Sequence, residues 1–235
     1  MNQLTILTAV KNAESTILNL LNSLNNQTSF DYHWLIIDGN SVDNTLAIIK
    51  DNCKCSYEII SQKDFSIYHA LNIGILNIKS DYYCVAGSDD VFSTTFVENI
   101  NDIINQGDFD LIFGAIKSNG QVYTSKLGNT AISPVNASHS IGTVIKTCLH
   151  KSVGLYSNMY PIIADKKFVV DALKFTNKVY HTTEIFGEYS QLGFSSVNSI
   201  DYVCDLFKLQ IKGGYNFYSQ LLLLLYRILK IKNLK

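Results

Sequence analysis

The regular alternation of short apolar segments with amphipathic segments constrains the fold of this chain most. Runs rich in β-branched and aromatic residues, which are typical of buried strands, lie at residues 4–10, 33–37, 57–60 and 82–86. Between these runs, apolar residues recur at the three-to-four-residue spacing of helices with one buried face. The alternation predicts an α/β fold, with a doubly wound, mostly parallel sheet and helices on both faces.

The same reasoning predicts individual elements. Ser41 is expected to cap a helix whose residues Val42, Leu46 and Ile49 point inward, and a second helix is expected over 67–78. Later helices are expected over 93–106 and from Asp165 onward, and later strands at 109–116, 121–126, 141–146 and 179–190.

Turn signals refine the second half of the chain. The sequence Ser118-Asn119-Gly120 predicts a hairpin into the strand at 121–126. Residues 127–140 are predicted to form a polar loop, and the strand at 141–146 is expected to make the sheet mixed. No repeat or linker divides the chain, whose 235 residues fit one domain.

Acidic residues follow several of the predicted strands. Right-handed crossovers would bring residues 8–12, 38–41, 62–66 and 87–90 to one edge of the sheet. Three of these four loops carry acids: Asp38, Asp64 and the pair Asp89-Asp90. Ligands of open α/β sheets bind at such an edge, so we expect a binding site there.

The pair Asp89-Asp90 directly follows the strand at 82–86 and the turn Gly87-Ser88. Two adjacent carboxylates suit a hard divalent cation whose remaining ligands are phosphate oxygens and water. Taken alone, an Asp-Asp turn more often caps the following helix in solvent. The neighbouring acidic loops favour the cation site.

Composition excludes some classes of protein. The formal net charge is −1, so no basic field suggests a nucleic-acid partner. The five cysteines are odd in number and lack zinc-site spacing, which indicates reduced thiols. The N-terminus lacks the features of a signal peptide, so a cytoplasmic protein is expected.

Motifs exclude others. A hydride-transferring Rossmann enzyme is disfavoured because no G-x-G-x-x-G follows the first strand. A nucleotidyltransferase would also place acids at a sheet edge, but its glycine-rich basic phosphate loop is missing near residues 10–12. It remains an alternative, as does a degenerate transferase fold that acts as a membrane-surface scaffold.

Several segments, in order, resemble one family. They are Thr8-Ala-Val-Lys-Asn12, Ile37-Asp-Gly-Asn-Ser-Val-Asp-Asn-Thr45, Asp64-Phe-Ser-Ile-Tyr-His-Ala-Leu-Asn-Ile-Gly74, Ser88-Asp89-Asp90 and Ala164-Asp165, with 186–189 and 193–196 as a closing segment. Over about residues 3–200 the chain resembles the inverting glycosyltransferases of family 2. The resemblance implies the A-type glycosyltransferase fold, which is Rossmann-like.

The chain departs from the family pattern at four positions. After Asp64, relatives have a glycine, an aspartate and a lysine where this chain has Ser66, His69 and Ile73. Gly39 stands where many relatives carry a second acid, which weakens any inference about how a nucleotide base is recognised.

The resemblance implies roles for individual residues. Asp90 would bind Mn²⁺ or Mg²⁺, and Asp165 would be the general base that takes the acceptor proton. The residues that would bind the nucleotide-sugar donor or the acceptor are Thr8, Val10, Asn12, Asp38, Asp64, Tyr68, Asn72, Asp89 and His139.

Without the resemblance, several of these residues have plainer explanations. Asp38 and Asp165 could cap helices, and Asp64 could be a turn residue. Tyr68 and Asn72 would more often be core or helix-surface residues, and a lone His139 in a polar loop is usually only exposed. Asp171 is a second, weaker candidate for the base, since it lies within a helix.

The C-terminal segment differs from the rest of the chain, and we divide the protein into a catalytic domain (1–200) and a helical segment (201–235). Residues 215–235 combine five consecutive leucines with Arg227, Lys230, Lys232 and Lys235. The apolar run is too short to span a bilayer of roughly 30 Å, but it suits a helix at an anionic membrane surface. Packing on the core or in a homo-oligomer is the alternative.

The resemblance extends this expectation to partners. Many bacterial relatives build O-antigens, capsules or exopolysaccharides on lipid-linked acceptors. We therefore expect a UDP-linked sugar donor, a polyprenyl-diphosphate-linked saccharide acceptor and a peripheral position on the cytoplasmic face of the inner membrane.

Overall fold

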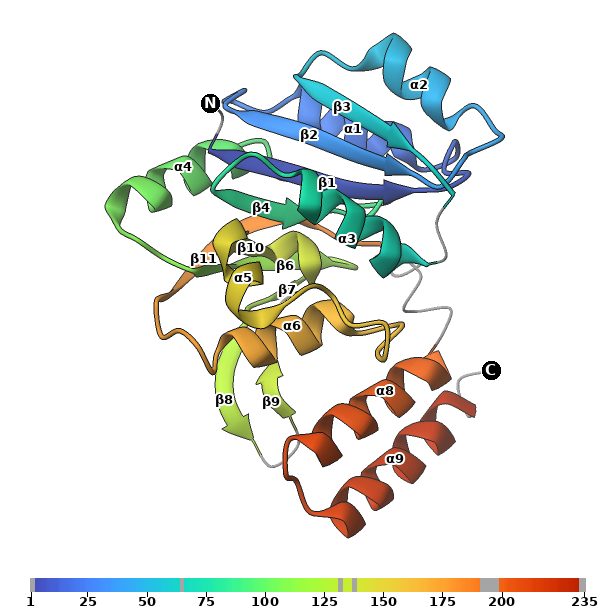
Figure 1. The fold of residues 1–235 in the computed structure, drawn as a ribbon, viewed down its shortest axis with the longest axis vertical. Coiled ribbons are helices and arrows are strands. Elements are labelled where there is room, and N and C mark those ends of the chain that lie inside the picture. Colours follow the sequence, from blue (N-terminus) through green and yellow to red (C-terminus); the bar gives the residue numbers. More distant parts are fainter. Residues whose placement is uncertain (1–2, 64–65, 131–132, 137–138, 191–198, 233–235) are drawn as a thin grey trace.

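The computed structural model describes residues 3–63, 66–130, 133–136, 139–190 and 199–232. It confirms the expected α/β architecture, with a central sheet covered by helices on both faces (Figure 1). Within these ranges the main sheet has nine strands in the order β3-β2-β1-β4-β10-β6-β11-β5, and β7 pairs with β6.

The N-terminal half of the sheet is parallel. It consists of β1 (Leu4–Val10), β2 (Tyr32–Asp38), β3 (Tyr57–Ser61) and β4 (Tyr82–Val85). The chain adds β2 and β3 on one side of β1 and then places β4 on the other side. The loops after β1 and β4 therefore diverge at a topological switch point, where open α/β sheets form crevices.

Helices bury both faces of the sheet. Alternate residues of each strand point to opposite sides, so each strand contributes side chains to an apolar cluster on either face. On β1, Leu4 and Ile6 belong to one apolar cluster and Leu7 to the other. Helices α1 (Ile17–Asn25), α2 (Thr45–Asn52) and α4 (Phe96–Gln106) cover the first face. Helices α3 (Ile67–Asn77), α6 (Ala164–Ala172) and α8 (Ser199–Lys212) cover the second.

The close packing of α3 on the sheet depends on Gly74. A Cβ atom at this position would lie 2.3 Å from a methyl carbon of Leu7 and 3.2 Å from Ile37. The absence of a side chain at Gly74 therefore lets the helix approach β1 and β2.

The C-terminal half of the sheet is mixed, as expected. Strand β10 (Thr143–Lys146) runs antiparallel to both β4 and β6 (Leu111–Ser118). Strand β11 (Val179–Glu188) is parallel to β6 and antiparallel to β5 (Val91–Phe92). Short helical turns flank β10: two 3₁₀ turns, Ser140–Gly142 and Thr147–Leu149, and α5 (His150–Val153).

The predicted hairpin is confirmed, but the predicted polar loop is wrong. Asn119 and Gly120 take positive φ angles of 48° and 76° between β6 and β7 (Gln121–Tyr123), which suits a hairpin turn. Residues expected in the loop form an antiparallel pair, β8 (Lys126–Thr130) and β9 (Ser133–Asn136). Backbone pairing needs no apolar residues, so the polar composition of this segment did not indicate strands.

The expected start of α2 is also wrong. This helix begins at Thr45. The hydroxyl of Ser41 does not cap the helix but accepts the Asn12 N–H. Val42, which was expected to point inward, is 90% exposed. Asp43 accepts hydrogen bonds from both the N–H and the hydroxyl of Thr45, which holds residues 43–45 in a turn before the helix.

The C-terminal helices form an antiparallel pair. Helix α8 buries Leu206 and Leu209 in the second cluster, and α9 (Phe217–Lys232) lies along α8 at the end of the molecule away from β3 (Figure 1). Gly214, at a φ of 83°, allows the sharp turn between them. Within the described ranges, no helix combines the length and the apolar character of a membrane span.

Candidate active site

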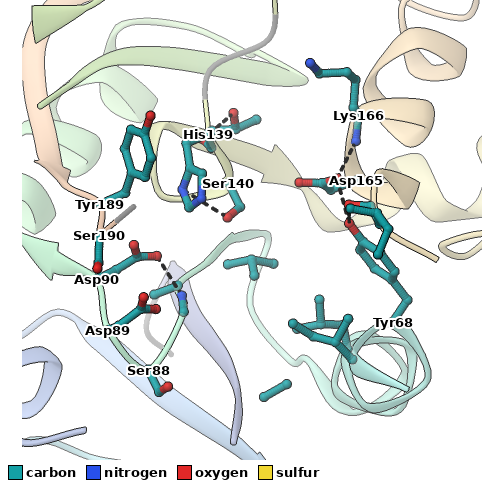
Figure 2. A pocket seen from close by; sticks show the side chains of 18 of the residues that line it. Tyr68, Ser88, Asp89, Asp90, His139, Ser140, Asp165, Lys166, Tyr189 and Ser190 are labelled. Carbon is teal, nitrogen blue, oxygen red and sulfur yellow. Dashed lines mark hydrogen bonds between the residues drawn. The ribbon is translucent and has the colours of Figure 1, made fainter. Parts of the chain in front are cut away.

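A cavity of about 880 Å³ lies at the switch point. The loops after β1 and β4 line it on one side, and α6 with the start of α3 lines it on the other. Figure 2 shows Asp89, Asp90 and His139 on one wall and Asp165, Lys166 and Tyr68 facing them. Loops from the two halves of the sheet thus enclose one space.

The acidic pair lies in a tight turn at the end of β4. The Gly87 N–H donates to Asp90 Oδ2 at 2.7 Å, and the Asp90 N–H donates to the Gly87 carbonyl at 3.2 Å. A Cβ atom on Gly87 would lie 2.8 Å from Asp89 Oδ1 and 3.2 Å from Asp90 Oδ2. Glycine at this position therefore lets both carboxylates fold back over the turn.

The carboxyl group of Asp90 is buried, with 2% of the residue exposed. Burial raises the pKa of Asp90 to about 6, and the nearby Asp89 adds to this rise, while His139 and the Gly87 N–H oppose it. The His139 ring stacks on Tyr189, with ring centroids 4.5 Å apart and planes at 12°. Asp90 is thus a buried carboxylate that a cation in the cavity would stabilise.

The donor set on this wall suits a divalent cation that shares its coordination with a ligand. Asp89, Asp90 and His139 offer carboxylate oxygens and an imidazole nitrogen to the same part of the cavity. Among the described residues, no three or more acidic, histidine or cysteine side chains are placed so that they could hold a metal ion by themselves. A metal here would need further oxygen ligands, as Mg²⁺ does when it binds substrate phosphates.

The loop after β1 is tied to the loop after β2. Asn12, at a positive φ of 51°, accepts the Val42 N–H on Oδ1 at 2.9 Å and donates its own N–H to Ser41. The hydroxyl of Thr45 accepts the Ala13 N–H at 2.7 Å. These contacts fix the rim of the cavity next to Lys11 and Asn12, which both line it.

Three other predicted binding residues lie beneath this rim. Thr8 is fully buried and accepts the indole N–H of Trp34 at 3.0 Å, and Val10 packs in the first apolar cluster. Asp38 is also buried: its Oδ1 accepts the Ser41 N–H, and its Oδ2 has no hydrogen-bond partner among the described residues. None of the three is among the described residues that line the cavity.

Asp165 lies in the first turn of α6 and lines the opposite wall. Its Oδ1 accepts the hydroxyl of Tyr68 and its neighbour's backbone N–H, both at 2.8 Å (Figure 2). The Tyr68 hydroxyl also lies 3.0 Å from the Ile162 carbonyl. Burial raises the pKa of Tyr68 well above its usual range, and the nearby Asp165 carboxylate contributes, so the phenol stays a hydrogen-bond donor.

Asn72 supports this wall from behind. Its side-chain amide donates to the Tyr156 carbonyl and accepts the Tyr156 N–H, both at 2.9 Å. The ring of Tyr156 lines the cavity and packs against Tyr68, with centroids 5.5 Å apart. Asn72 thereby positions the segment that leads to Asp165, without itself being among the described lining residues.

Two further candidates remain. Asp64 is outside the described residues. Asp171 forms ion pairs with Lys167 and Lys174 and does not line the cavity.

Sequence reasoning missed several residues of the cavity, among them Lys166 and Tyr202. The side chains of these two residues are in contact. Lys166 directly follows the predicted base, Asp165. No local pattern indicated Tyr202, which lies in the C-terminal segment that the sequence analysis separated from the catalytic domain.

Comparison with known proteins identifies the family. The model of the family described as "Glycosyl transferase family 2" matches residues 5–156. The chain belongs to glycosyltransferase family 2. A search of curated proteins found no match.

Solved glycosyltransferase structures share the A-type fold. S. aureus TarS 1–349 has a TM-score of 0.66 at 15% identity, with 89% of this chain and 64% of that chain covered. Mannosyltransferase PcManGT from Pyrobaculum calidifontis, in complex with GDP-Man and Mn²⁺, has a TM-score of 0.70 at 11% identity, with 91% and 64% covered. This chain spans 64% of TarS 1–349 and 39% of a longer TarS chain.

A smaller relative is covered more fully. Glucosyl-3-phosphoglycerate synthase from Mycobacterium tuberculosis, in complex with Mn²⁺, UDP and glucosyl-3-phosphoglycerate, has a TM-score of 0.62 at 10% identity, with 88% of this chain and 80% of that chain covered. At these identities the likeness extends to the fold.

The burial of Asp90 predicts a pH-dependent cost to stability in the metal-free protein. Its pKa in the folded state is above the ordinary 3.8, so the penalty grows between about pH 4 and pH 6 and is complete above pH 6. Asp90→Asn keeps an oxygen for the Gly87 N–H but cannot ionise. In EDTA at pH 7.5, this variant should melt about 3–6 °C higher than the wild type, with little difference near pH 4.

Scanning calorimetry at the two pH values measures this difference. Asp89→Asn, which replaces a less buried carboxyl group, should show a smaller change. An Asp90→Asn variant that melts lower than the wild type at both pH values would show that the carboxylate does not destabilise the fold.

Proposed function

We propose that this protein is an inverting glycosyltransferase that transfers a sugar from a nucleotide-diphosphate donor, such as a UDP-sugar, to a saccharide acceptor. One observation carries the proposal: the acidic pair after β4, with Asp90 buried, and the carboxylate of Asp165 face each other across one cavity at the switch point (Figure 2). Inverting transfer needs a diphosphate site and a base on opposite sides of the anomeric carbon. Family membership supports the same reaction class.

The acceptor side requires a base but no protein nucleophile. Asp165 would accept the proton of the acceptor hydroxyl as that oxygen attacks the anomeric carbon. Its Oδ1 is held by Tyr68 and the Lys166 N–H, and its Oδ2 forms no hydrogen bond with the residues that the structure describes. Oδ2 is therefore the oxygen available to take the proton.

The donor side would be formed by the loops after β1 and β4. Asn12 and Lys11 would contact the nucleotide, and Asp38 remains our candidate for an acceptor of the base N–H, because its Oδ2 has no partner among the described residues. Asp90 would bind Mn²⁺ or Mg²⁺, with phosphate oxygens and water as further ligands, and Asp89 and His139 would contact the donor. When bound, such a cation neutralises the charge of the departing diphosphate.

Replacing Asp165 by Asn tests the proposed base. The amide cannot accept the acceptor proton, so kcat should fall by a factor of roughly a hundred or more while the donor still binds. Calorimetric titration with UDP and Mn²⁺ measures donor binding, and NMR of the wild-type product identifies the anomer. Asp171→Asn, on the outer side of the same helix, should keep activity. A product with retained configuration would rule out the proposed mechanism.

Replacing Tyr68 by Phe tests whether its hydroxyl positions the base. The ring packing on Tyr156 remains, but Asp165 loses one hydrogen bond, so we expect kcat to fall about tenfold with an unchanged KM for the donor. Tyr82→Phe is the matched control, because it also removes one buried tyrosine hydrogen bond, to the Phe109 carbonyl, away from the cavity. Equal losses of activity in both variants would indicate a general effect on folding.

We further propose a peripheral position at the cytoplasmic face of a bacterial inner membrane, with a polyprenyl-diphosphate-linked acceptor in surface-polysaccharide synthesis. Helix α9 supports this with exposed apolar side chains at helical spacing: Tyr218, Leu222, Leu225 and Leu229. Its other side packs on α8, and Lys230 is exposed beside the apolar face. Such a helix suits an anionic lipid surface.

The triple substitution Leu222→Gln, Leu225→Gln, Leu229→Gln tests this surface. It should release the protein from anionic liposomes in a sedimentation assay without lowering the melting temperature, because these side chains face solvent. Leu76→Gln, at an equally exposed leucine on α3, is the control. If the wild type does not bind anionic liposomes at low salt, the membrane proposal is wrong. Light scattering would then show whether the same face forms a homo-oligomer.

A further inference from the structure

The cavity has a cationic group that the proposed mechanism does not use. Lys166 lines the same wall as Asp165, and its ammonium lies 3.2 Å from the hydroxyl of Tyr202 and 5.6 Å from that ring's centroid. In Figure 2 the Lys166 side chain extends away from the Asp165 carboxylate. The ammonium is thus fixed in place by a neutral partner.

The neighbouring Lys167, Lys174 and Lys208 have carboxylate partners, whereas Lys166 has none in the part of the chain that the structure describes. Lys167 and Lys174 pair with Asp171, and Lys208 pairs with Asp205. No carboxylate of the described residues lies within 4.0 Å of the Lys166 ammonium. A half-buried ammonium with no acidic partner offers strong, charge-assisted hydrogen bonds to an anion that enters the cavity.

The position of this ammonium decides which substrate carries the anion. In the proposed mechanism the donor diphosphate lies at the wall of Asp89 and Asp90, and the acceptor oxygen, which gives its proton to the base, attacks from the opposite side. Lys166 follows the base directly in α6, so an anion bound there belongs to the acceptor.

Tyr202 connects this position to the C-terminal helices. It lies in α8. This helix is held in place because its Asp205 carboxylate accepts the Ile162 N–H at 3.1 Å and because Leu206 and Leu209 are buried in the second apolar cluster. Lys166 and Tyr202 both lie beyond residue 156, where the match to the family model ends.

We propose that Lys166 and Tyr202 form a subsite for an anionic group of the acceptor. The group is a phosphate of a carrier or a carboxylate of an acidic sugar, since both accept hydrogen bonds from an ammonium and a phenol. This inference rests on the proposed transferase function, and it assigns the acceptor-side recognition to α6 and α8.

Three probes test the subsite in the full-length protein saturated with UDP and Mn²⁺, which fills the donor side. They are N-acetylglucosamine 1-phosphate, methyl glucuronide and neutral methyl N-acetylglucosaminide, titrated by calorimetry. At least one anionic probe should bind more tightly than the neutral probe, and the tighter of the two identifies phosphate or carboxylate as the source. Lys166→Gln should weaken that probe by about tenfold or more and leave the neutral probe unchanged.

Matched variants separate charge from folding. Lys166→Arg should retain much of the affinity, Tyr202→Phe should lose a few-fold, and Lys167→Gln, whose ammonium pairs with Asp171, should behave as the wild type. Equal binding of all three probes to the wild type, no binding of either anionic probe, or unchanged binding in Lys166→Gln would overturn the subsite. Failure of UDP and Mn²⁺ to bind in the first step would instead count against the transferase function.

Discussion

The site depends on the change of direction in the strand order at β1. Because β2 and β4 pair with β1 on opposite sides, the chain leaves the ends of β1 and β4 in different directions, and a crevice forms at these strand ends. Helices on both faces bury the sheet, so the crevice at the strand ends is where polar side chains can gather. The acidic pair after β4 lies there, and Asp90 is buried at an electrostatic cost that a bound cation would offset.

The opposite wall is assembled from distant parts of the chain. Tyr68 at the start of α3 holds Asp165 in α6, and Asn72 from the same helix clamps the backbone of Tyr156. The second apolar cluster contains α3, α6 and α8 together, which gives this wall a rigid support. The proposed base and the proposed anion subsite therefore lie in one packed layer. Substitutions in α8 would affect the acceptor side of the cavity as well as the packing of α8 on α9.

Much of the fold and part of the site could be predicted locally. Apolar periodicity gave the positions of β1 to β4 within a residue or two, and Asn119-Gly120 gave the hairpin between β6 and β7, because these signals depend on neighbouring residues. The start of α2 was wrong because side chains of another loop and of Asp43 hold residues 41–45. Strands β8 and β9 were missed because their pairing depends on backbone hydrogen bonds rather than on an apolar pattern.

The sequence by itself determined the α/β class, the parallel first half, the acidic pair after β4 and the resemblance to the family. Only the tertiary structure decided which polar residues share the cavity. Thr8 and Val10, which were expected to bind substrate, are buried and do not line the cavity. Lys166 and Tyr202, which the sequence did not indicate, line it. The physical reason is that a side chain's direction depends on helix packing across the sheet, and the packing of α8 on α6 joins residues 36 positions apart that have no common sequence pattern.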